Sequence, residues 1–381
     1  MIDKERLMSL FTWLVKIDSV SKEEGQIAAV LQEKLAGMGA DIMVDKAGEA
    51  IGGQSGNIIA KFKGNVDAPV LMLNAHMDTV EPGRGVKPVF KDGVFTSDGT
   101  TILGADDKSA IAILLETLLT IQEKNLKHGP LELVLTVCEE VGLLGAKHLD
   151  FSLISSKYGF ALDASDPRGI ITRAPAANRF VMKVYGKDAH AGAAPERGIN
   201  AILLAGKAIA GVTLGRIDEE TTCNIGVIEG GKATNIVPDL VTLHGEVRSH
   251  NETKLIATTQ TILDAFEKVV ADYRGATGSG TLPAFEALVE DDFPLTHITE
   301  DHPVVVLAQR AAANLGRTMT CRTTGGGADA NIFFSKGIVT GVIGTGMQDM
   351  HTVRESVPLD AMVETAELMI EIIRLHAELT N

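Results

Sequence analysis

The sequence predicts an α/β protein with a mostly parallel sheet covered by helices on both faces, together with a smaller inserted α+β domain. Short apolar runs alternate with helical stretches at the start of the chain and again near its end, an order typical of a parallel sheet. In between, apolar and polar residues alternate as in strands with one wet face. The length of 381 residues also exceeds one typical compact domain. We therefore expect a discontinuous main domain, residues 1–177 and 293–381, and an inserted domain, residues 178–292.

The main domain is expected to begin with two helices. Apolar residues recur at helical spacing over residues 7–15. A second helix is expected to begin at Ser21, with Glu24 completing a capping box, and a long helix is expected over about 107–123. Apolar runs short enough for buried strands lie at residues 57–62, 69–74, 131–137 and 159–162.

The inserted segment predicts the element order β-α-β-β-α-β, which describes a small open sheet with two helices on one face. The expected elements are a strand near 180–184, a helix near 200–214, strands near 222–228 and 240–247, a helix at 252–273 and a strand near 284–289. The main domain then resumes with a helix whose first turn contains Pro303, a strand at 338–343 and a terminal helix from about Leu359.

The charge and the cysteine content limit which partners and which cellular compartment are expected. Lys and Arg number 35 against 50 Asp and Glu, a net charge of −15, which argues against a nucleic-acid or anionic membrane partner. The three cysteines show no paired spacing, so neither a disulfide framework nor a thiolate zinc cluster is indicated. No apolar stretch reaches the roughly 20 residues that span a bilayer, and the N-terminus opens on a charged helix without a signal-peptide core. We expect a cytoplasmic protein.

Residue types that bind metals follow the predicted strands at five places. They are His76 with Asp78, Asp106 with Asp107, Glu139 with Glu140, Asp163, and His351. In parallel sheets, ligands bind beyond the carboxyl ends of the strands, which is where these residues are expected.

Each place taken singly has a plainer interpretation. A lone histidine is more often structural, and paired acidic residues at a helix N-terminus are often caps. Acidic residues at the end of a buried strand, as at Glu139 and Glu140, are costly unless paired or coordinated. Two histidines and three carboxylates together form a nitrogen and oxygen site suited to Zn²⁺, Mn²⁺ or Co²⁺.

As an ordered set, these motifs match a known family. The segments His76-x-Asp78, Gly104-Ala-Asp-Asp-Lys108, Glu139-Glu-Val-Gly142, Asp163 and His351 resemble the co-catalytic di-zinc metallopeptidases, which include peptidase T, glutamate carboxypeptidase and aminoacylases. The Gly-Ala-Asp-Asp-Lys and Glu-Glu-Val-Gly forms are most similar to the peptidase T-like branch. The resemblance runs along essentially the whole chain, including the inserted domain.

The resemblance implies a role for each residue. His76 and Asp163 would bind one divalent ion, Glu140 and His351 would bind the other, and Asp106 would bridge the two. The ions would be zinc, with cobalt or manganese as alternatives. Asp78 would orient the imidazole of His76, and Glu139 would act as the general base. The Asp106–Asp107 peptide is expected to be cis.

The resemblance extends to the inserted domain. Its Gly186-Lys-Asp-Ala-His190-Ala-Gly192 segment resembles a loop whose histidine stabilises the oxyanion in the partner subunit, which implies a homodimer. Asn235 resembles a residue that contacts substrate, and Arg248 one that clamps a substrate carboxylate. Gly326 lies in a main-domain glycine loop that resembles the lining of the same pocket. Without the resemblance, Asn235 would be interpreted as a turn residue and Arg248 as part of a surface salt bridge.

The implied activity is hydrolysis of small peptides by a metal-dependent exopeptidase, an aminopeptidase of the peptidase T kind. However, Asp106 follows Asp78 by only 28 positions (106 minus 78), where peptidase T typically carries a long insertion that helps to recognise the peptide N-terminus. The substrate is therefore left open between a tripeptide, a dipeptide and an N-acyl amino acid. A catalytically idle binding protein is the alternative of a different class, and the retained Glu139 and metal-ligand candidates count against it.

Overall fold

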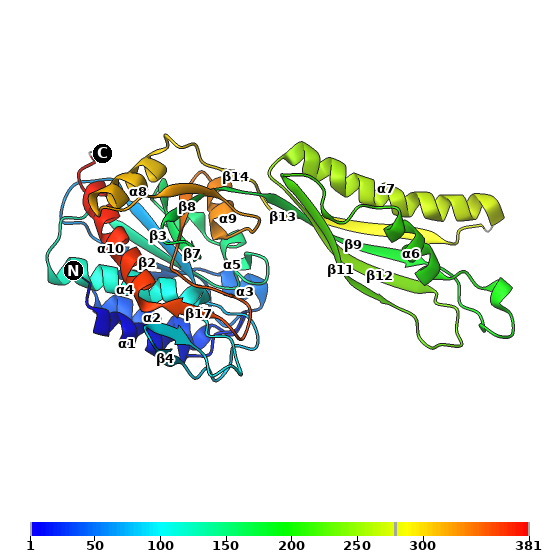
Figure 1. Ribbon diagram of the computed structural model, residues 1–381, viewed down its shortest axis with the longest axis horizontal. Coiled ribbons are helices and arrows are strands. Elements are labelled where there is room, and N and C mark those ends of the chain that lie inside the picture. The colour runs from blue at the N-terminus through cyan, green and yellow to red at the C-terminus, as the bar shows by residue number, and fades with distance from the viewer. Residues whose placement is uncertain (1, 278–279, 380–381) are drawn as a thin grey trace. The chain divides into compact units, whose positions relative to one another are not determined.

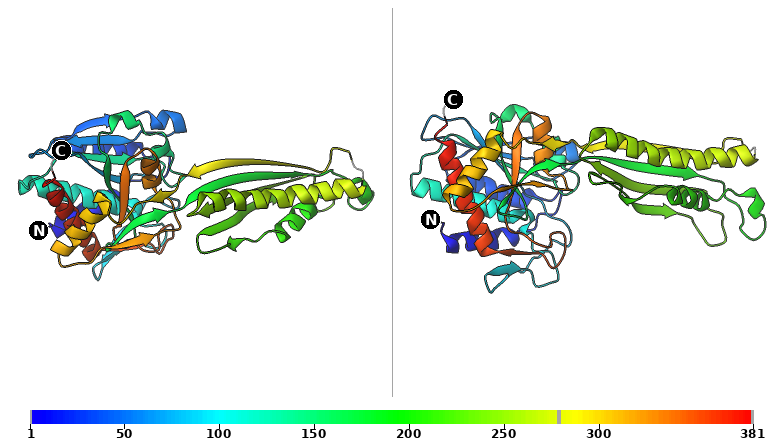
Figure 2. Two further views of the ribbon diagram at one scale, coloured as in Figure 1. Left: turned by 90° about the horizontal axis from the view of Figure 1, so that it is seen from above. Right: turned by 45° about the horizontal axis from the view of Figure 1, so that its top comes forward.

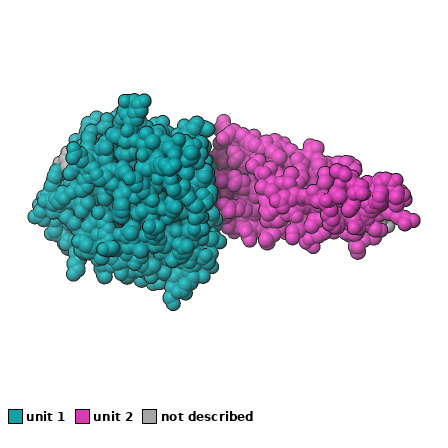
Figure 3. Space-filling view, turned by 90° about the horizontal axis from the view of Figure 1, so that it is seen from below, with its two compact units in different colours: residues 1–173, 296–381 teal, residues 174–295 magenta. Residues whose placement is uncertain are grey.

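The computed structural model describes residues 2–277 and 280–379. The chain divides into two compact units, shown in different colours in Figure 3. Unit 1 comprises Met1–Arg173 and Thr296–Asn381, and unit 2 comprises Ala174–Leu295. The insertion expected from the sequence, residues 178–292, lies within unit 2.

The main sheet has nine strands (Figure 1). They are β1 (Asp41–Val44), β2 (Ile58–Phe62), β3 (Leu71–His76), β6 (Leu131–Thr136), β7 (Tyr158–Ala164), β8 (Gly169–Ala174), β14 (Thr296–His297), β15 (Thr320–Thr323) and β16 (Val339–Gly344). Eight of them follow the order β1-β2-β6-β3-β7-β16-β8-β14, and β15 pairs with β8.

The centre of this sheet is parallel and its flanks are largely antiparallel. β3 pairs in parallel with β6 and β7, and β7 pairs in parallel with β16. The pairs β1–β2, β2–β6 and β8–β16 are antiparallel. Every residue of β3 and β6 is buried, which requires cover on both faces of the sheet. The predicted α/β class is confirmed, with a mixed sheet whose parallel strands lie in the middle.

Helices provide the cover in unit 1. They are α1 (Lys4–Val15), α2 (Gly25–Gly37), α3 (Ala47–Ile51), α4 (Ala105–Glu123), α5 (Leu144–Lys147), α8 (Pro303–Asn314), α9 (Asp329–Ser335) and α10 (Leu359–His376), with a 3-10 turn at Phe151–Leu153. Helix α4 packs on β3 and β7 and also against α1 and α10, so nearly all of its side chains are buried. In the described part of the chain, no helix combines the length and apolar character needed to cross a membrane.

The capping box predicted at Ser21 and Glu24 is wrong. Helix α2 begins at Gly25, and the Glu24 side chain makes no capping hydrogen bond to it. Instead the Ser21 hydroxyl donates to the carboxylate of Asp78 at 2.6 Å, and Glu24 Oε1 accepts from the backbone N–H of Cys138 at 3.0 Å. The two side chains bond to the segments that follow β3 and β6, each more than fifty residues away, where buried N–H and carboxylate groups need partners.

The short interval between Asp78 and Asp106 contributes two strands to a separate three-stranded sheet. This sheet consists of β4 (Val89–Lys91), β5 (Val94–Thr96) and β17 (Ser356–Pro358), in the order β17-β5-β4. The pairing of β17 with β5 is antiparallel. Two segments distant in sequence, the one before α4 and the one that follows His351, are therefore held side by side.

Unit 2 is an open antiparallel sheet with helices. Its elements are β9 (Ala176–Tyr185), α6 (Ala201–Ala210), β10 (Gly215–Arg216), β11 (Thr221–Gly230), β12 (Leu240–Ser249), α7 (Glu252–Thr277) and β13 (Ala284–Phe293), with a 3-10 turn at Pro195–Arg197. The strand order is β10-β11-β12-β9-β13, and α7 runs lengthwise along the sheet (Figure 2). Phe180, Met182 and Val184 alternate along β9 and enter the core of this unit. The predicted β-α-β-β-α-β order is confirmed, with the short β10 added.

Candidate active site

The carboxyl ends of three adjacent parallel strands gather the predicted ligands at one edge of the main sheet. His76 is the last residue of β3, and Asp163 is the second-last residue of β7. Glu139 and Glu140 follow β6, which ends at Thr136. Because β6, β3 and β7 are neighbours and run in the same direction, their ends meet.

Asp106 lies at the centre of this group, in the first turn of α4. Its Oδ1 is 3.0 Å from His76 Nε2, and its Oδ2 is 3.3 Å from His351 Nε2. His351 Nε2 also lies 2.9 Å from Glu140 Oε1. The peptide bond between Asp106 and Asp107 is cis, as the resemblance implies.

Two sets of potential ligand atoms share Asp106. The ligand atoms of His76, Asp106 and Glu140 all lie within 4.8 Å of one another, and so do those of Asp106, Asp107 and Asp163. A residue that belongs to both sets can bridge two ions, which is the position that the resemblance implies for Asp106. The grouping differs from the expected pairs: His76 groups with Glu140 instead of Asp163, Asp107 joins Asp163, and His351 belongs to neither group.

The site concentrates negative charge away from water. Burial, reinforced by the neighbouring Asp106, raises the pKa of Asp163 to about 8. Burial likewise raises the pKa of Glu139 well above its usual range, and the nearby Asp163 adds to the effect. The pKa of His351 rises to about 10 because its ring hydrogen-bonds to Asp106 and Glu140. Burial opposes ionisation of Asp106, but the bonds from both histidines prevail and lower its pKa.

This donor set fits divalent cations. Closely spaced buried carboxylates are unfavourable unless a positive charge compensates them. One of them, Asp107, also has a buried Oδ1 without a hydrogen-bond partner in the described residues. Imidazole nitrogens with carboxylate oxygens are the ligands that zinc, manganese and cobalt accept.

Asp78 lies directly behind the predicted ligands and is fully buried. Its Oδ1 is 3.3 Å from His76 Nδ1, and its backbone carbonyl oxygen is 2.9 Å from the same nitrogen. The carboxylate also accepts the backbone N–H of Glu139 at 2.9 Å and that of Glu140 at 3.2 Å. The predicted contact with His76 is present, and Asp78 additionally anchors the backbone of Glu139 and Glu140.

Two further acidic residues lie beside the site, and the sequence indicated no chemical role for either. Asp329, the first residue of α9, is buried and accepts a hydrogen bond from Thr136 Oγ1. Burial raises the pKa of Asp329 to about 6. Glu355 is also buried and accepts backbone N–H groups of the segment that leads into α4. Asp329 follows the glycine loop that contains Gly326, which is a sequence signal, whereas Glu355 has no local pattern that reveals it.

Unit 2 holds the predicted residues His190, Asn235 and Arg248, at opposite ends of its sheet, whereas Gly326 belongs to unit 1. His190 and Asn235 lie together, because Ala191 N–H donates to the Asn235 carbonyl at 2.9 Å and His190 forms a β-bridge with Ile236. Arg248 lies at the other end of β12: Leu240 pairs with Tyr185, whereas Arg248 pairs with Ala177. These positions are eight residues apart on β12 (248 minus 240), which is roughly 27 Å along an antiparallel strand.

The side chains of His190 and Arg248 contact other residues of unit 2. His190 Nδ1 accepts the backbone N–H groups of Gly192 and Ala193 at 3.2 and 3.1 Å. Arg248 forms an ion pair with Glu246 at 3.0 Å, and its guanidinium carbon lies 5.7 Å from the ring centre of Phe293. The salt bridge that the sequence alone suggested for Arg248 is therefore present.

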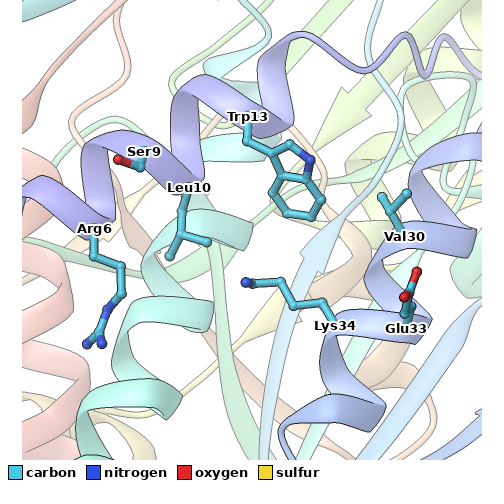
Figure 4. A pocket seen from close by; sticks show the side chains of 7 residues that line it. All are labelled: Arg6, Ser9, Leu10, Trp13, Val30, Glu33 and Lys34. Atoms are coloured by element: carbon cyan, nitrogen blue, oxygen red, sulfur yellow. The ribbon is translucent and has the colours of Figure 1, made fainter.

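A groove of about 550 Å³ between α1 and α2 is a separate feature (Figure 4). Its lining side chains are those of Arg6, Ser9, Leu10, Trp13, Val30, Glu33 and Lys34. Glu33 is the only carboxylate among them, and the guanidinium of Arg6 is already paired with Glu116 and Glu123. This groove therefore lacks the grouped ligands found at the end of the sheet.

Two family models match parts of this chain. The family model described as the peptidase dimerisation domain matches residues 176–274, and that of peptidase family M28 matches residues 57–192. Peptidase T of Fusobacterium nucleatum is 27% identical over 325 residues, covering 82% of this chain and 76% of the relative.

Two solved structures are more similar. A tripeptidase from Staphylococcus aureus has a TM-score of 0.92 and 39% identity, with 99% of each chain covered. Aminopeptidase PepT from Bacillus cereus has a TM-score of 0.89 and 41% identity, with 99% of this chain and 100% of that chain covered. The two match in fold and sequence over almost the full length. The chain therefore belongs to the peptidase T-like family of metal-dependent exopeptidases.

Proposed function

We propose that this chain is a two-metal aminopeptidase that hydrolyses small peptides, with zinc as its native metal. The observation that carries the proposal is that Asp106 belongs to both groups of ligand atoms within 4.8 Å. We assign His76 and Asp163 to one ion, Glu140 and His351 to the other, and Asp106 to both. Two relatives are named a tripeptidase and an aminopeptidase, which supports a small peptide with a free N-terminal amine as the substrate.

Glu139 is the residue that we assign to proton transfer. When bound, the metal ions would lower the pKa of a water molecule and polarise the scissile carbonyl. The Glu139 carboxylate would take a proton from that water and return it to the leaving amine. Its backbone is anchored by Asp78, and only 8% of the residue is exposed, so its position is restricted and shielded from bulk water.

We further propose that a second subunit completes the site. Leu240, at the end of β12 near the His190 loop, and Arg248 lie roughly 27 Å apart along that strand, a separation too large for both ends to contact one small substrate within a single copy of unit 2. Two copies would resolve this, with His190 acting in the partner subunit, as the resemblance implies. The match of residues 176–274 to a dimerisation domain and the exposed Val227, Ile228 and Leu288 of unit 2 support a homodimer.

The orientation of His190 suits a hydrogen-bond donor. Its Nδ1 accepts two backbone N–H groups and therefore carries no proton, so the proton of the neutral ring is on Nε2. An exposed Nε2–H can donate to the oxygen on which negative charge develops during hydrolysis. Asn235, from the adjoining loop, would contact the same substrate, and Arg248 would bind its carboxylate. Gly326 would line the pocket from unit 1.

The second candidate is an N-acyl amino acid hydrolase or a dipeptidase using the same metals and the same base. The observation that favours it is the interval of 28 positions between Asp78 and Asp106, which contains the small β4–β5 hairpin.

We further propose a cytoplasmic location. The three cysteines are free thiols, which fits a reducing cytoplasm.

A substrate screen with Zn²⁺, Co²⁺ and Mn²⁺ supplied separately tests the proposal. Tripeptides and dipeptides with a free amine, the same peptides acetylated at the N-terminus, and peptides amidated at the C-terminus would be compared by product analysis. Hydrolysis that requires the free amine supports the aminopeptidase, and hydrolysis confined to acylated substrates supports the alternative. Metal-reconstituted protein that cleaves none of these substrates contradicts both.

A further inference from the structure

Glu355 is a buried glutamate whose carboxylate serves one short backbone segment. Its Oε2 accepts the N–H groups of Leu103 at 2.8 Å and Gly104 at 2.7 Å, and its Oε1 accepts that of Asp106 at 2.9 Å. The residue is only 1% exposed. Hydrogen bonds to a carboxylate are stronger than those between neutral groups. The three hydrogen bonds to Glu355 therefore hold the backbone of the turn that leads into α4.

The segment that carries Glu355 also carries His351. Gln348 and Ser356 close it with two backbone hydrogen bonds, 2.9 Å from Gln348 N to Ser356 O and 3.1 Å from Ser356 N to Gln348 O. This closed segment therefore approaches Asp106 twice. His351 Nε2 lies 3.3 Å from the Asp106 carboxylate, and Glu355 Oε1 accepts the backbone N–H of Asp106.

We propose that Glu355 is a positioning residue that sets the geometry of the two metal ions by holding the backbone of Asp106. The inference rests on the proposed two-metal site. Asp106 can bridge two ions only if its carboxylate lies between both groups of ligands, and the side chain starts from a backbone that Glu355 holds. Partners behind the ligands of a metal ion typically change its affinity by about 10- to 100-fold when they are removed.

The test is the variant Glu355→Gln, compared with the matched variant Glu132→Gln. Glu132 is also a buried glutamate, 2% exposed, whose carboxylate accepts the backbone N–H groups of Ser155 and Ser156 at 3.0 Å. It is the second residue of β6, whereas the site lies beyond the last. The two variants therefore make the same chemical change to a buried backbone anchor, one at the site and one away from it.

Three quantities would be measured on the full chain after metal removal. They are the Co²⁺ stoichiometry and affinities by calorimetric titration, the visible absorption spectrum of the Co²⁺-loaded protein, and thermal unfolding of the metal-free protein. For Glu355→Gln we expect at least one Co²⁺ to bind about 10- to 100-fold more weakly, with a changed spectrum. For Glu132→Gln we expect wild-type affinities and spectrum, whatever the change in unfolding temperature.

Wild-type affinities and spectrum in Glu355→Gln would overturn the inference and leave the two-metal proposal standing. Wild-type protein that binds fewer than two Co²⁺ ions would overturn both. If Glu355→Gln is not obtained in folded form, the same titration on Glu355→Asp decides. That variant keeps the buried charge, but its side chain is one methylene too short to reach all three N–H groups. We therefore expect weakened Co²⁺ binding. Unchanged Co²⁺ binding and an unchanged spectrum would count against the inference.

Discussion

Asp78 accepts the backbone N–H of Glu139 at 2.9 Å, so the carboxylate that touches the His76 imidazole also anchors the proposed general base. Asp78 lies on the segment after β3 and Glu139 on the segment after β6, and these strands are adjacent and parallel. One carboxylate can therefore orient a metal ligand and the base together.

We expect Asp78→Asn to lower kcat and weaken metal binding, each by about 10- to 100-fold. The amide keeps the size of the side chain but presents an NH₂ group where one oxygen accepted an N–H. Steady-state kinetics and metal titration would measure the two effects. Ser21→Ala is the matched control, because it removes only the hydroxyl that donates to Asp78 and should change either quantity much less. Wild-type kcat in Asp78→Asn would contradict the role of this carboxylate.

Glu139→Gln should separate metal binding from turnover. We expect a fall in kcat of about 10²- to 10⁴-fold, because the amide cannot accept the proton. The metal content by elemental analysis should stay at the wild-type value, since Glu139 is not among the proposed ligands. Glu140→Gln is the contrast, and it should lose metal as well as activity. Loss of metal from Glu139→Gln would mean that Glu139 is itself a ligand.

His190→Ala should lower kcat by about 10²- to 10³-fold, the usual effect of removing one donor to an oxyanion. A mixing experiment tests whether the histidine acts across subunits. Glu139→Gln and His190→Ala chains would be unfolded together in equal amounts and refolded with metal. A mixed dimer has one complete site if His190 acts on its partner, and equal mixing then restores about a quarter of wild-type activity. No recovery in verified mixed dimers would show that His190 does not act across subunits.

His376 should make stability depend on pH. It is the last residue of α10 and fully buried, and neither ring nitrogen has a hydrogen-bond partner in the described residues. Burial lowers its pKa from 6.5 to about 4, so the unfolded chain takes up a proton between these values while the folded chain does not. Stability is therefore complete above pH 6.5 and falls as the pH drops toward 4, by about 2 kcal/mol between pH 7 and pH 5.

Urea unfolding at pH 7 and pH 5 measures this effect. The variant His376→Leu should lose less stability than wild type over the same interval, by about the same 2 kcal/mol. Substitution of the exposed His148 by Leu is the control and should not reduce the loss. An equal loss in wild type and His376→Leu would show that another group dominates.

Much of the site followed from local sequence patterns. Apolar runs predict buried strands because a strand covered on both faces leaves no polar position, as β3 and β6 show. Once such strands are predicted to be parallel, the residues after them must gather at one edge. His76, Glu140 and Asp163 could therefore be grouped before any coordinates, although 87 residues separate the first from the last (163 minus 76).

Other features depended on contacts that no local pattern encodes. Ser21 and Glu24 have the spacing of a helix cap, yet both are used by buried groups near the site, because unsatisfied buried groups cost more than a missing cap. Glu355 is separated from Asp106 by 249 positions (355 minus 106), and only the pairing of β17 with β5 makes the two neighbours.

The sequence by itself determined the α/β class, the main elements of unit 2, the long helices and central strands of unit 1, and the residues from which a metal site could be built. It did not predict β1, β8, β15 or the sheet formed by β4, β5 and β17. The predicted features depend on the periodicity of apolar residues and on the alternation of strands with helices that makes neighbouring strands parallel. Both patterns are visible in the sequence. Only the tertiary structure decided that Asp78 anchors Glu139, that Glu355 holds the backbone of Asp106, and that His190 and Arg248 lie at opposite ends of one sheet. The physical reason is that strand register and long-range hydrogen bonds depend on the packing of the whole unit, whereas propensity and spacing report only neighbours along the chain.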